Sequence, residues 1–357
     1  MSTLKTSHWL SILTRAILRF FFLFVKFIEP AWNTFHPTYP TRNSEPQGLI
    51  VYDDIILFSG FTDNYTKASR RIYARNVAIF DGNTTWRRME DMPLSNGVTH
   101  MATVKVGSVV YLCGGYYGGH PGSHSPLCLR YNHSTIPNHG TQWAFLPNLP
   151  NGGTGGGGMI YSTKHNTLYY AGGGQRLRPG SSYTRDVNST WKLELHNARA
   201  GWKPSAPLPY LANHISYVTH RDSNGTERHF MLGGQISEEE HDGNLNYNYE
   251  FIPDSETWIA RAPIPFPRGH AASSTRMIGC GFIIAGGAMN NPDPTSRKRI
   301  SIDDVSYYNI YTDQWTTSIG TLPSIGNTPI VDIHSNGYMY FVNSRLSQRR
   351  RIGVPFG

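Results

Sequence analysis

Short apolar runs alternate with polar turns along this chain, and one such pattern recurs over nearly its whole length. In a clear copy, 271–275 alternates apolar and polar residues, 279–281 reads as a turn, and 282–285 is a continuous apolar run that ends at a glycine pair. A variable loop follows, then 305–310, a turn, and a last run that carries Trp315. Short β-rich runs between turn residues predict four strands in each unit.

Two independent markers give the period of this pattern. Tryptophans recur at intervals of 54 to 59 residues, and a second marker closing an apolar run, a glycine pair in four of the six units, follows each one after 27 to 31 residues. The tryptophans are Trp32, Trp86, Trp143, Trp202, Trp258 and Trp315. The second marker is Ser59-Gly60, Gly114-Gly115, Gly172-Gly173, Gly233-Gly234, Gly286-Gly287 and, with both glycines lost, Val342-Asn343. Four-stranded units repeated at this spacing predict a β-propeller, whose blades stack radially.

These residues resemble the repeat of the kelch superfamily. The resemblance rests on the glycine pair, an aromatic residue near the third strand and the tryptophan that follows it, and it covers roughly residues 20–343. Arg268-Gly269-His270, at the start of the fifth repeat, is similar to the family pattern. The resemblance implies an all-β, kelch-type propeller like the central domain of galactose oxidase. It does not imply one function, because function resides in sites rather than in folds.

The sixth unit is expected to be split between the two ends of the chain. Residues from about Pro329 to Val342 supply two strands, and we expect the residues after Asn343 to be too few for a long loop and two more strands. The repeat offset from Trp32 places the missing third strand within Phe20–Ile28. We therefore expect six blades, with N-terminal strands pairing with C-terminal strands to close the ring. The chain is predicted to consist of a basic apolar segment at residues 1–19, the propeller at residues 20–343 and a basic tail at residues 344–357.

Residues 9–28 have a second interpretation. This twenty-residue stretch is largely apolar, and about twenty such residues can span a membrane. Arg15, Arg19 and Lys26 lie inside it, and each costs about 2.5–3.5 kcal/mol near a bilayer centre. No clean signal-peptide cleavage site follows. Two interpretations therefore stay open: a closing strand preceded by a basic amphipathic helix, and a signal anchor. Any membrane contact is expected within residues 1–28.

Composition narrows the class of protein. The 357 residues are 39% hydrophobic, 13% aromatic and only 16% charged, which excludes a disordered chain. A formal net charge of +8 is modest for this length, and the basic run at 349–351 is short, so we expect no nucleic-acid partner.

The cysteines and the glycosylation motifs leave the compartment open. Cys113, Cys128 and Cys280 match neither a disulfide framework nor a zinc spacing, and we expect the first two to pack as small buried residues. The five sequons are about as many as the composition produces by chance; they are Asn64, Asn83, Asn132, Asn188 and Asn224. A membrane-associated or secretory location and a cytoplasmic one are both compatible with the sequence.

The long, variable loops after the second strands should share one face, because strand direction alternates within a blade. Long loops on a rigid scaffold usually carry binding, so we expect function on this face. The loop charge is mixed but mainly basic, which favours a protein or a small acidic ligand, although solvated loop charges would look the same. The candidate ligand-binding residues here are His120, His124, Arg176, Arg178, Arg185, Glu238, His241 and Arg297.

Three further candidates, His100, His214 and His270, occupy nearly equivalent repeat positions beside the first strands. Three imidazoles around a central channel could bind a metal or move protons. Alternatively, each hydrogen-bonds within its own blade while the channel keeps the three apart, and this is what we expect. We accordingly predict no metal and no cofactor.

Enzymes with kelch-like propellers offer specific comparisons. A galactose-oxidase-like copper centre needs a cysteine crosslinked to tyrosine, for which the cysteines here have no suitable context. Plant specifier proteins use Glu-x3-Asp-x3-His for iron; Glu238 and Asp242 have that spacing, but Asn246 replaces the histidine. No hydrolase or protease motif occurs. We predict a non-catalytic propeller that binds a protein or small-molecule ligand; the alternative is an isomerase, cyclase or hydrolase with its site at the channel mouth.

Overall fold

The computed structural model describes residues 32–34, 45–62, 67–77, 85–133, 142–178, 181, 183–237, 242–293, 296, 298–326, 328–343 and 347–352. This part of the chain is almost entirely β-structure, with short 3-10 turns at Pro150–Gly152, Leu195–Ala200 and Ala272–Ser274. The predicted strand at 20–28 lies outside it. Within the described part, no helix is long and apolar enough to cross a membrane.

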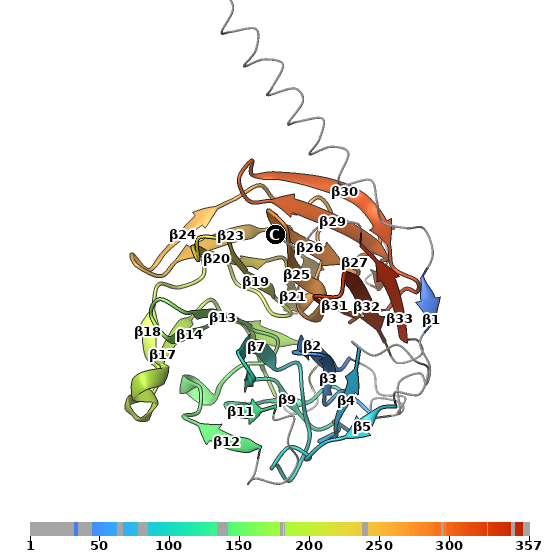
Figure 1. Ribbon diagram of the computed structural model, residues 1–357. Helices are drawn as coiled ribbons and strands as arrows, with labels where there is room; N and C mark the ends of the chain where they lie inside the picture. The colour runs from blue at the N-terminus through green and yellow to red at the C-terminus, as the bar shows by residue number, and fades with distance from the viewer. Residues whose placement is uncertain are drawn as a thin grey trace, which may run out of the picture.

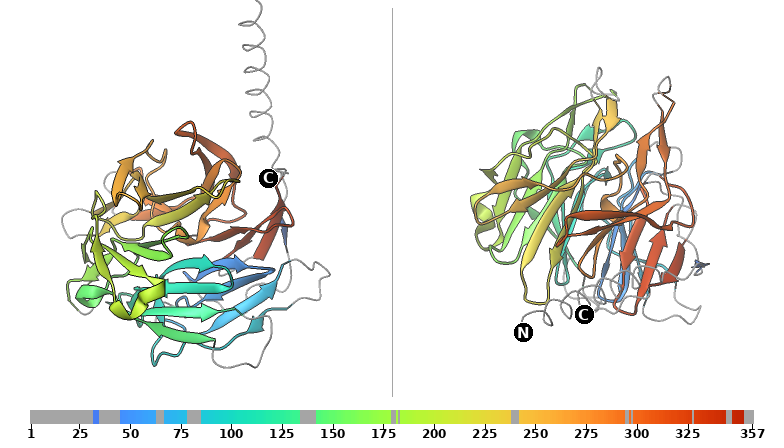
Figure 2. Two further views of the ribbon diagram at one scale, coloured as in Figure 1. Left: turned by 60° about the vertical axis from the view of Figure 1, so that its left-hand side comes forward. Right: turned by 90° about the horizontal axis from the view of Figure 1, so that it is seen from above.

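Each repeat unit forms one four-stranded antiparallel sheet, and the sheets fan around a common centre (Figure 1). From the inner to the outer strand, the first sheet contains β2 (Gln47–Val51), β3 (Asp54–Phe58), β4 (Ile72–Asn76) and β5 (Arg87–Arg88), and the second contains β7 (Ala102–Val106), β8 (Val109–Cys113), β11 (Cys128–Asn132) and β12 (Trp143–Leu146). The third contains β13 (Gly158–Ser162), β14 (Thr167–Ala171), β17 (Thr190–Glu194) and β18 (Lys203–Ser205), and the fourth contains β19 (Ser216–Arg221), β20 (Glu227–Leu232), β23 (Asn248–Ile252) and β24 (Thr257–Ala260). The fifth contains β25 (Thr275–Ile278), β26 (Gly281–Ala285), β29 (Asp304–Asn309) and β30 (Gln314–Thr321), and the last contains β31 (Ile330–Ile333), β32 (Tyr338–Val342), β33 (Ser347–Arg351) and β1 (Asn33–Thr34). Two further views show the same sheets from other sides (Figure 2).

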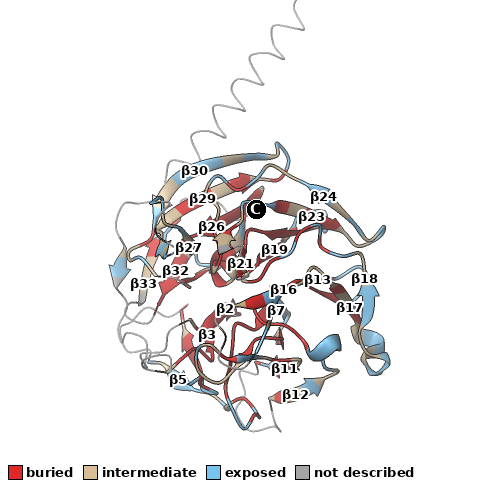
Figure 3. Ribbon diagram, turned by 180° about the vertical axis from the view of Figure 1, so that it is seen from behind, coloured by how far each residue is buried: buried red, intermediate tan, exposed pale blue. Residues whose placement is uncertain are grey.

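Apolar side chains pack between neighbouring sheets. Second strands such as β3 and β26 are buried along their whole length, whereas outer strands such as β30 are mostly exposed, so burial falls from the centre outward (Figure 3). One apolar cluster joins the last sheet to the first and contains Ile50, Ile55 and Tyr340. The hydrophobic core is therefore distributed between sheets, as expected where each sheet cannot bury both faces alone.

The periodic tryptophans connect one sheet to the one before it. Indole Nε1 of Trp258 donates to the Ala206 carbonyl at 3.0 Å, and that of Trp315 donates to the Ala262 carbonyl at 2.8 Å. Trp143 and Trp202 make the corresponding bonds. Trp32 donates at 3.0 Å to the carbonyl of Thr321, at the end of the fifth sheet. Trp32 therefore occupies the sixth repeat position, as its spacing predicts.

The two ends of the chain meet in one sheet, but the predicted assignment of its strands is wrong in part. The third strand is β33, which pairs with β32, and β1 adds the fourth at its edge. Residues 347–351 are thus a strand rather than part of a tail. The prediction assumed a long loop after the second strand, whereas here only residues 343–346 separate β32 from β33.

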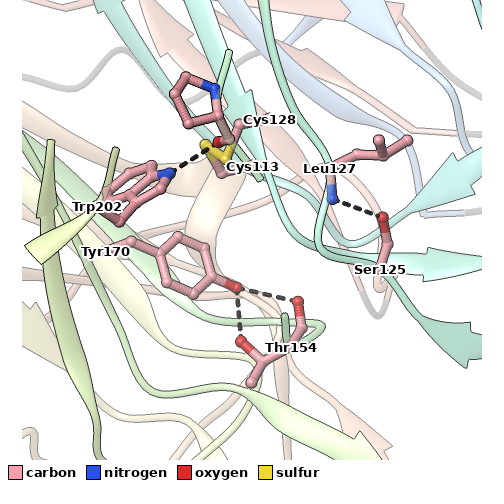
Figure 4. The surroundings of a disulfide bond; sticks show 8 residues. Cys113, Ser125, Leu127, Cys128, Thr154, Tyr170 and Trp202 are labelled. Carbon is pink, nitrogen blue, oxygen red and sulfur yellow. Dashed lines mark hydrogen bonds between the residues drawn. A yellow bond between two sulfur atoms is a disulfide. The ribbon is translucent and has the colours of Figure 1, made fainter. Parts of the chain in front are cut away.

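Cys113 and Cys128 form a disulfide, which corrects the expectation of two free, buried thiols (Figure 4). The two residues face each other across β8 and β11 with their Cα atoms 4.1 Å apart. Antiparallel neighbours outside a hydrogen-bonded pair approach about this closely. The partners are separated by a variable loop, so cysteine spacing alone did not reveal the pairing.

The long loops after the second strands fold into hairpins on one face. They are β9 (Tyr116–Tyr117) with β10 (Ser123–His124), joined by β6 (Val98–Thr99); β15 (Gly174–Arg176) with β16 (Thr184–Asp186); β21 (Gln235–Ser237) with β22 (Asp242–Asn244); and β27 (Ala288–Asn290) with β28 (Arg299–Ser301). Successive hairpins touch, β10 with β15, β16 with β21 and β22 with β27. Together they form a collar of hairpins around the centre of this face.

Candidate functional site

One repeat position carries a left-handed backbone just before the first strand of its sheet. Glu45, His100, His214 and His270 have φ values between 52° and 64° there, and Gly156 has 69°. Positive φ is uncommon for residues other than glycine and tends to cluster at functional sites. The backbone N–H of Gly156 donates to the His100 carbonyl at 3.1 Å, and that of His270 to the His214 carbonyl at 3.4 Å. These segments therefore lie side by side at the centre.

The three histidines converge, which overturns the expectation that the channel keeps them apart. The rings of His214 and His270 stack with centroids 3.9 Å apart, and the His100 ring lies 4.8 Å from that of His214 and 6.0 Å from that of His270. Equivalent positions come together because all three side chains project toward the same point from hydrogen-bonded neighbouring segments.

Glu45 completes this cluster. Its Oε2 lies 2.9 Å from Nε2 of His100, and both side chains are nearly buried. Burial opposes ionisation of the carboxyl, but the contact with His100 and the nearby His270 and His120 outweigh it and lower the pKa of Glu45 to about 2. A buried carboxylate therefore faces the imidazoles.

Two of the histidines are held neutral. Burial, together with the neighbouring imidazoles, keeps the pKa of His214 well below its usual value. Burial likewise lowers the pKa of His270 to about 3, although Glu45 opposes the shift. Neutral imidazoles retain a lone pair on one ring nitrogen, so these side chains can accept a proton or bind a metal ion.

A cavity of about 270 Å³ lies between the histidines and the collar of hairpins. Arg176 and Arg299 bring positive charge to its wall, and Glu45 is the one carboxylate among its described lining residues. The Arg176 guanidinium lies 4.5 Å above the Tyr116 ring, and its Nε donates to the Gly122 carbonyl at 3.1 Å. The remaining lining residues are Phe61, His100, His120, Tyr183, Thr184, Asn213, His214, Gln235, Ser237 and His270.

A second, smaller cavity of about 30 Å³ lies against the same three histidines, beside Gln47 and Tyr217. Its volume suits about one water molecule. The histidines line both spaces, so they separate the larger cavity from the narrow interior below it.

A buried carboxylate, Asp186, ties the hairpins to the cluster. It accepts hydrogen bonds from the Thr184 hydroxyl and Asn213 Nδ2, each at 2.6 Å, and from the Ser237 backbone N–H at 2.9 Å. Oδ1 of Asn213 in turn contacts Nδ1 of His214. This network orients the His214 ring.

The predicted site residues divide into four groups. His100, His120, Arg176, His214 and His270 line the large cavity. His124 does not; its Nδ1 accepts the backbone N–H of Arg176 at 3.2 Å. Arg178 and Arg185 are exposed. The side chains of Glu238, His241 and Arg297 lie outside the described residues.

Glu45 and Arg299, which line the cavity with Arg176, were not among the predicted site residues. Glu45 could have been found, because it stands 55 residues before His100, within the range of the repeat interval. Arg299 was visible only as one of several basic residues in a variable loop, with no repeat position to single it out.

Comparisons with known proteins place the fold but not the activity. No model of a known protein family matches the chain, and no curated protein does. Among solved structures, the chain is similar to YjhT, a kelch-type β-propeller protein, with a TM-score of 0.63 and 14% sequence identity over 88% of this chain and 95% of that one. At this identity, the similarity shows a β-propeller fold alone.

Proposed function

We propose that this chain is a six-bladed kelch-type propeller, closed by the pairing of β1 with β33, that binds a small anionic molecule in its axial cavity. Closure is supported by the innermost strands: β2 contacts both β7 and β31, while β13, β19 and β25 connect the others in order. The hydrogen bond from Trp32 to Thr321 supports it from the outside of the sheets. Kelch character is supported by the two repeat markers in the sequence.

The observation that carries ligand binding is the cavity of about 270 Å³ with two arginines in its wall. Small-molecule sites are concave and of roughly this size or larger, with a few well-placed polar groups. Arginine forks suit carboxylate and phosphate groups, and both arginines are ordered by contacts with backbone carbonyls, of Gly122 and Ile236. A concave space between the hairpins and the histidines suits a small molecule better than a protein surface, so we favour the small ligand.

The test is a thermal-shift screen with small carboxylates and phosphate esters, followed by calorimetry. A ligand that binds only the folded chain raises its melting temperature in proportion to its saturation. Arg176→Gln and Arg299→Gln should each weaken binding about tenfold or more, because each removes a charge-assisted hydrogen bond. Arg185→Gln, an exposed residue on the same collar, is the matched control. Equal binding by all three variants would rule out the axial cavity as the binding site.

A second candidate function is proton transfer on the bound molecule, as in an isomerase, cyclase or hydrolase. The contact of 2.9 Å between Glu45 and His100 favours it, because a carboxylate beside an imidazole is a common general-base arrangement. Incubation of a bound ligand in D2O, followed by NMR, would detect exchange of a carbon-bound hydrogen. Exchange that disappears in Glu45→Gln would support catalysis, and its absence in the unmodified chain would argue for binding alone.

A further inference from the structure

We propose that His100, His214, His270 and Glu45 bind one divalent transition-metal ion, Zn²⁺ being the best match, at the inner end of the axial cavity. The ligand atoms of the three histidines all lie within 4.8 Å of one another. The four side chains come from four different sheets, so only the folded chain assembles them. The inference goes beyond ligand binding in the cavity and does not depend on it.

The contacts of the three rings indicate which nitrogen of each histidine would coordinate the ion. Nδ1 of His214 contacts the Asn213 amide oxygen, so that nitrogen carries the proton and Nε2 is the free ligand atom. Nδ1 of His100 lies 3.0 Å from the Thr99 hydroxyl, while its Nε2 faces Glu45. Nδ1 of His270 is buried and has no hydrogen-bond partner in the described part of the chain.

The unpaired nitrogen of His270 is the feature that packing alone does not explain. A buried polar atom without a partner costs about 1–3 kcal/mol, and in a native structure such an atom calls for an explanation, for example a bound water or ion. Packing of the three imidazoles against one another does not give this nitrogen a partner, whereas coordination of an ion would.

The surroundings provide the outer shell that metal sites require. Ligating histidines usually donate their second nitrogen to a carboxylate, carbonyl or amide oxygen, which fixes the ring. His214 does so to Asn213, and Asn213 is held in turn by Asp186 at 2.6 Å. The backbone of the ligands is fixed as well, since His270 donates to the His214 carbonyl.

The donor set selects the kind of ion. Three imidazoles and one carboxylate suit Zn²⁺, Co²⁺ or Ni²⁺, whereas Mg²⁺ and Ca²⁺ prefer oxygen donors. Bonds of about 2.0–2.2 Å place neighbouring ligand atoms roughly 3–3.5 Å apart, so the histidines must close in slightly around the ion. One carboxylate leaves a net positive charge that faces the cavity, where an anion or water could complete the coordination.

The test uses the full, untagged chain after dialysis against EDTA, titrated with ZnCl₂ by calorimetry and with CoCl₂ by visible absorption. We expect one ion per chain and a Co²⁺ d–d spectrum. His270→Ala and His214→Ala should each reduce the affinity at least 100-fold, and Glu45→Gln, which preserves all three imidazoles, should reduce it about tenfold and shift the Co²⁺ spectrum. His196→Ala, an exposed histidine, is the control and should bind as the unmodified chain does.

Two results would overturn the proposal: no stoichiometric uptake by a chain with native near-ultraviolet circular dichroism, or undiminished uptake by the folded His270→Ala variant. Folding of each variant is checked by the same spectrum, and the Glu45→Gln result decides if a histidine variant does not fold. Only metal salts are added in this test, so a negative result would not contradict binding of an organic ligand in the cavity. Conversely, loss of organic-ligand binding in Arg176→Gln would not contradict the metal result.

Discussion

The same left-handed backbone has two uses at the residue scale. In the glycine pairs it lets two backbone segments approach too closely for any side chain; a Cβ on Gly287 (φ 94°) would lie 2.5 Å from the Gly269 carbonyl oxygen. At the centre it is occupied by Glu45 and the histidines, whose side chains have open space to enter. Strain of about 1–3 kcal/mol for each such residue persists only where the surroundings enforce it. Glycine is therefore found where two segments approach closely, and Glu45 and the histidines, which line the cavity, occupy the other central positions.

Gly287→Ala separates these two effects when it is compared with Gly107→Ala. Both glycines have positive φ, but a Cβ on Gly107 would meet nothing within 4 Å. We expect Gly107→Ala to reduce the free energy of unfolding by about 1–2 kcal/mol, the cost of a left-handed alanine. Gly287→Ala should cost more than about 3 kcal/mol, because the clash with backbone adds to it. Urea denaturation measures both, and equal losses would contradict the close-approach explanation.

At the element scale, the tryptophans act as connectors between sheets. Trp315→Phe removes the hydrogen bond to Ala262 while keeping most of the apolar contact, so we expect a loss of about 1 kcal/mol in the free energy of unfolding. Trp191 lies in β17, out of step with the repeat, and its indole donates no hydrogen bond within the described residues. If Trp191→Phe were as destabilising as Trp315→Phe in the same denaturation experiment, the connecting role would be refuted.

The disulfide is a second connection, within one sheet. It closes a loop with a sequence separation of 15 residues, for which loop-closure entropy predicts about 3 kcal/mol. The double variant Cys113→Ala/Cys128→Ala should lose this amount, and a reducing agent should destabilise the unmodified chain equally while leaving the variant unchanged. If the reducing agent destabilised the variant, or left the unmodified chain unchanged, this stabilising role of the disulfide would be contradicted.

Disulfide bonds persist in oxidising compartments, so we propose a secretory location for the protein.

At the scale of the whole molecule, the repeat was predictable because both of its sequence markers have a structural role. Tryptophan spacing reflects bonds between sheets, and glycine spacing reflects close backbone approach, so the strands of each unit followed from the sequence. The loop that separates Cys113 from Cys128 and the few residues between β32 and β33 carry no such periodic signal, and the predictions for the cysteines and for the third strand of the last sheet were both wrong. The convergence of His100, His214 and His270 depends on how far apart the inner strands lie, which no local pattern records. Their repeat equivalence was visible, but their contact was not.

The stability of the whole molecule should fall with acidity, and His229 in β20 provides a defined part of this dependence. Burial lowers the pKa of His229 to about 4, with Glu227 opposing the shift. Below the ordinary value of about 6.5, the unfolded chain takes up a proton that the folded chain excludes. The free energy of unfolding should therefore be highest above pH 6.5 and fall by up to about 1.4 kcal/mol per pH unit toward pH 4. Urea denaturation at pH 7.5, 6 and 5, with EDTA present, should give a shallower decline for His229→Gln than for the unmodified chain.

Glu227 acts in the same direction at lower pH. Burial opposes its ionisation, but hydrogen bonds from Thr163 outweigh burial and lower the pKa of Glu227, so the stability that it contributes is present above its unfolded pKa and is lost below it. Because other buried histidines titrate in both proteins, the difference between the two curves isolates His229, and parallel curves would show that its folded-state pKa is not lowered.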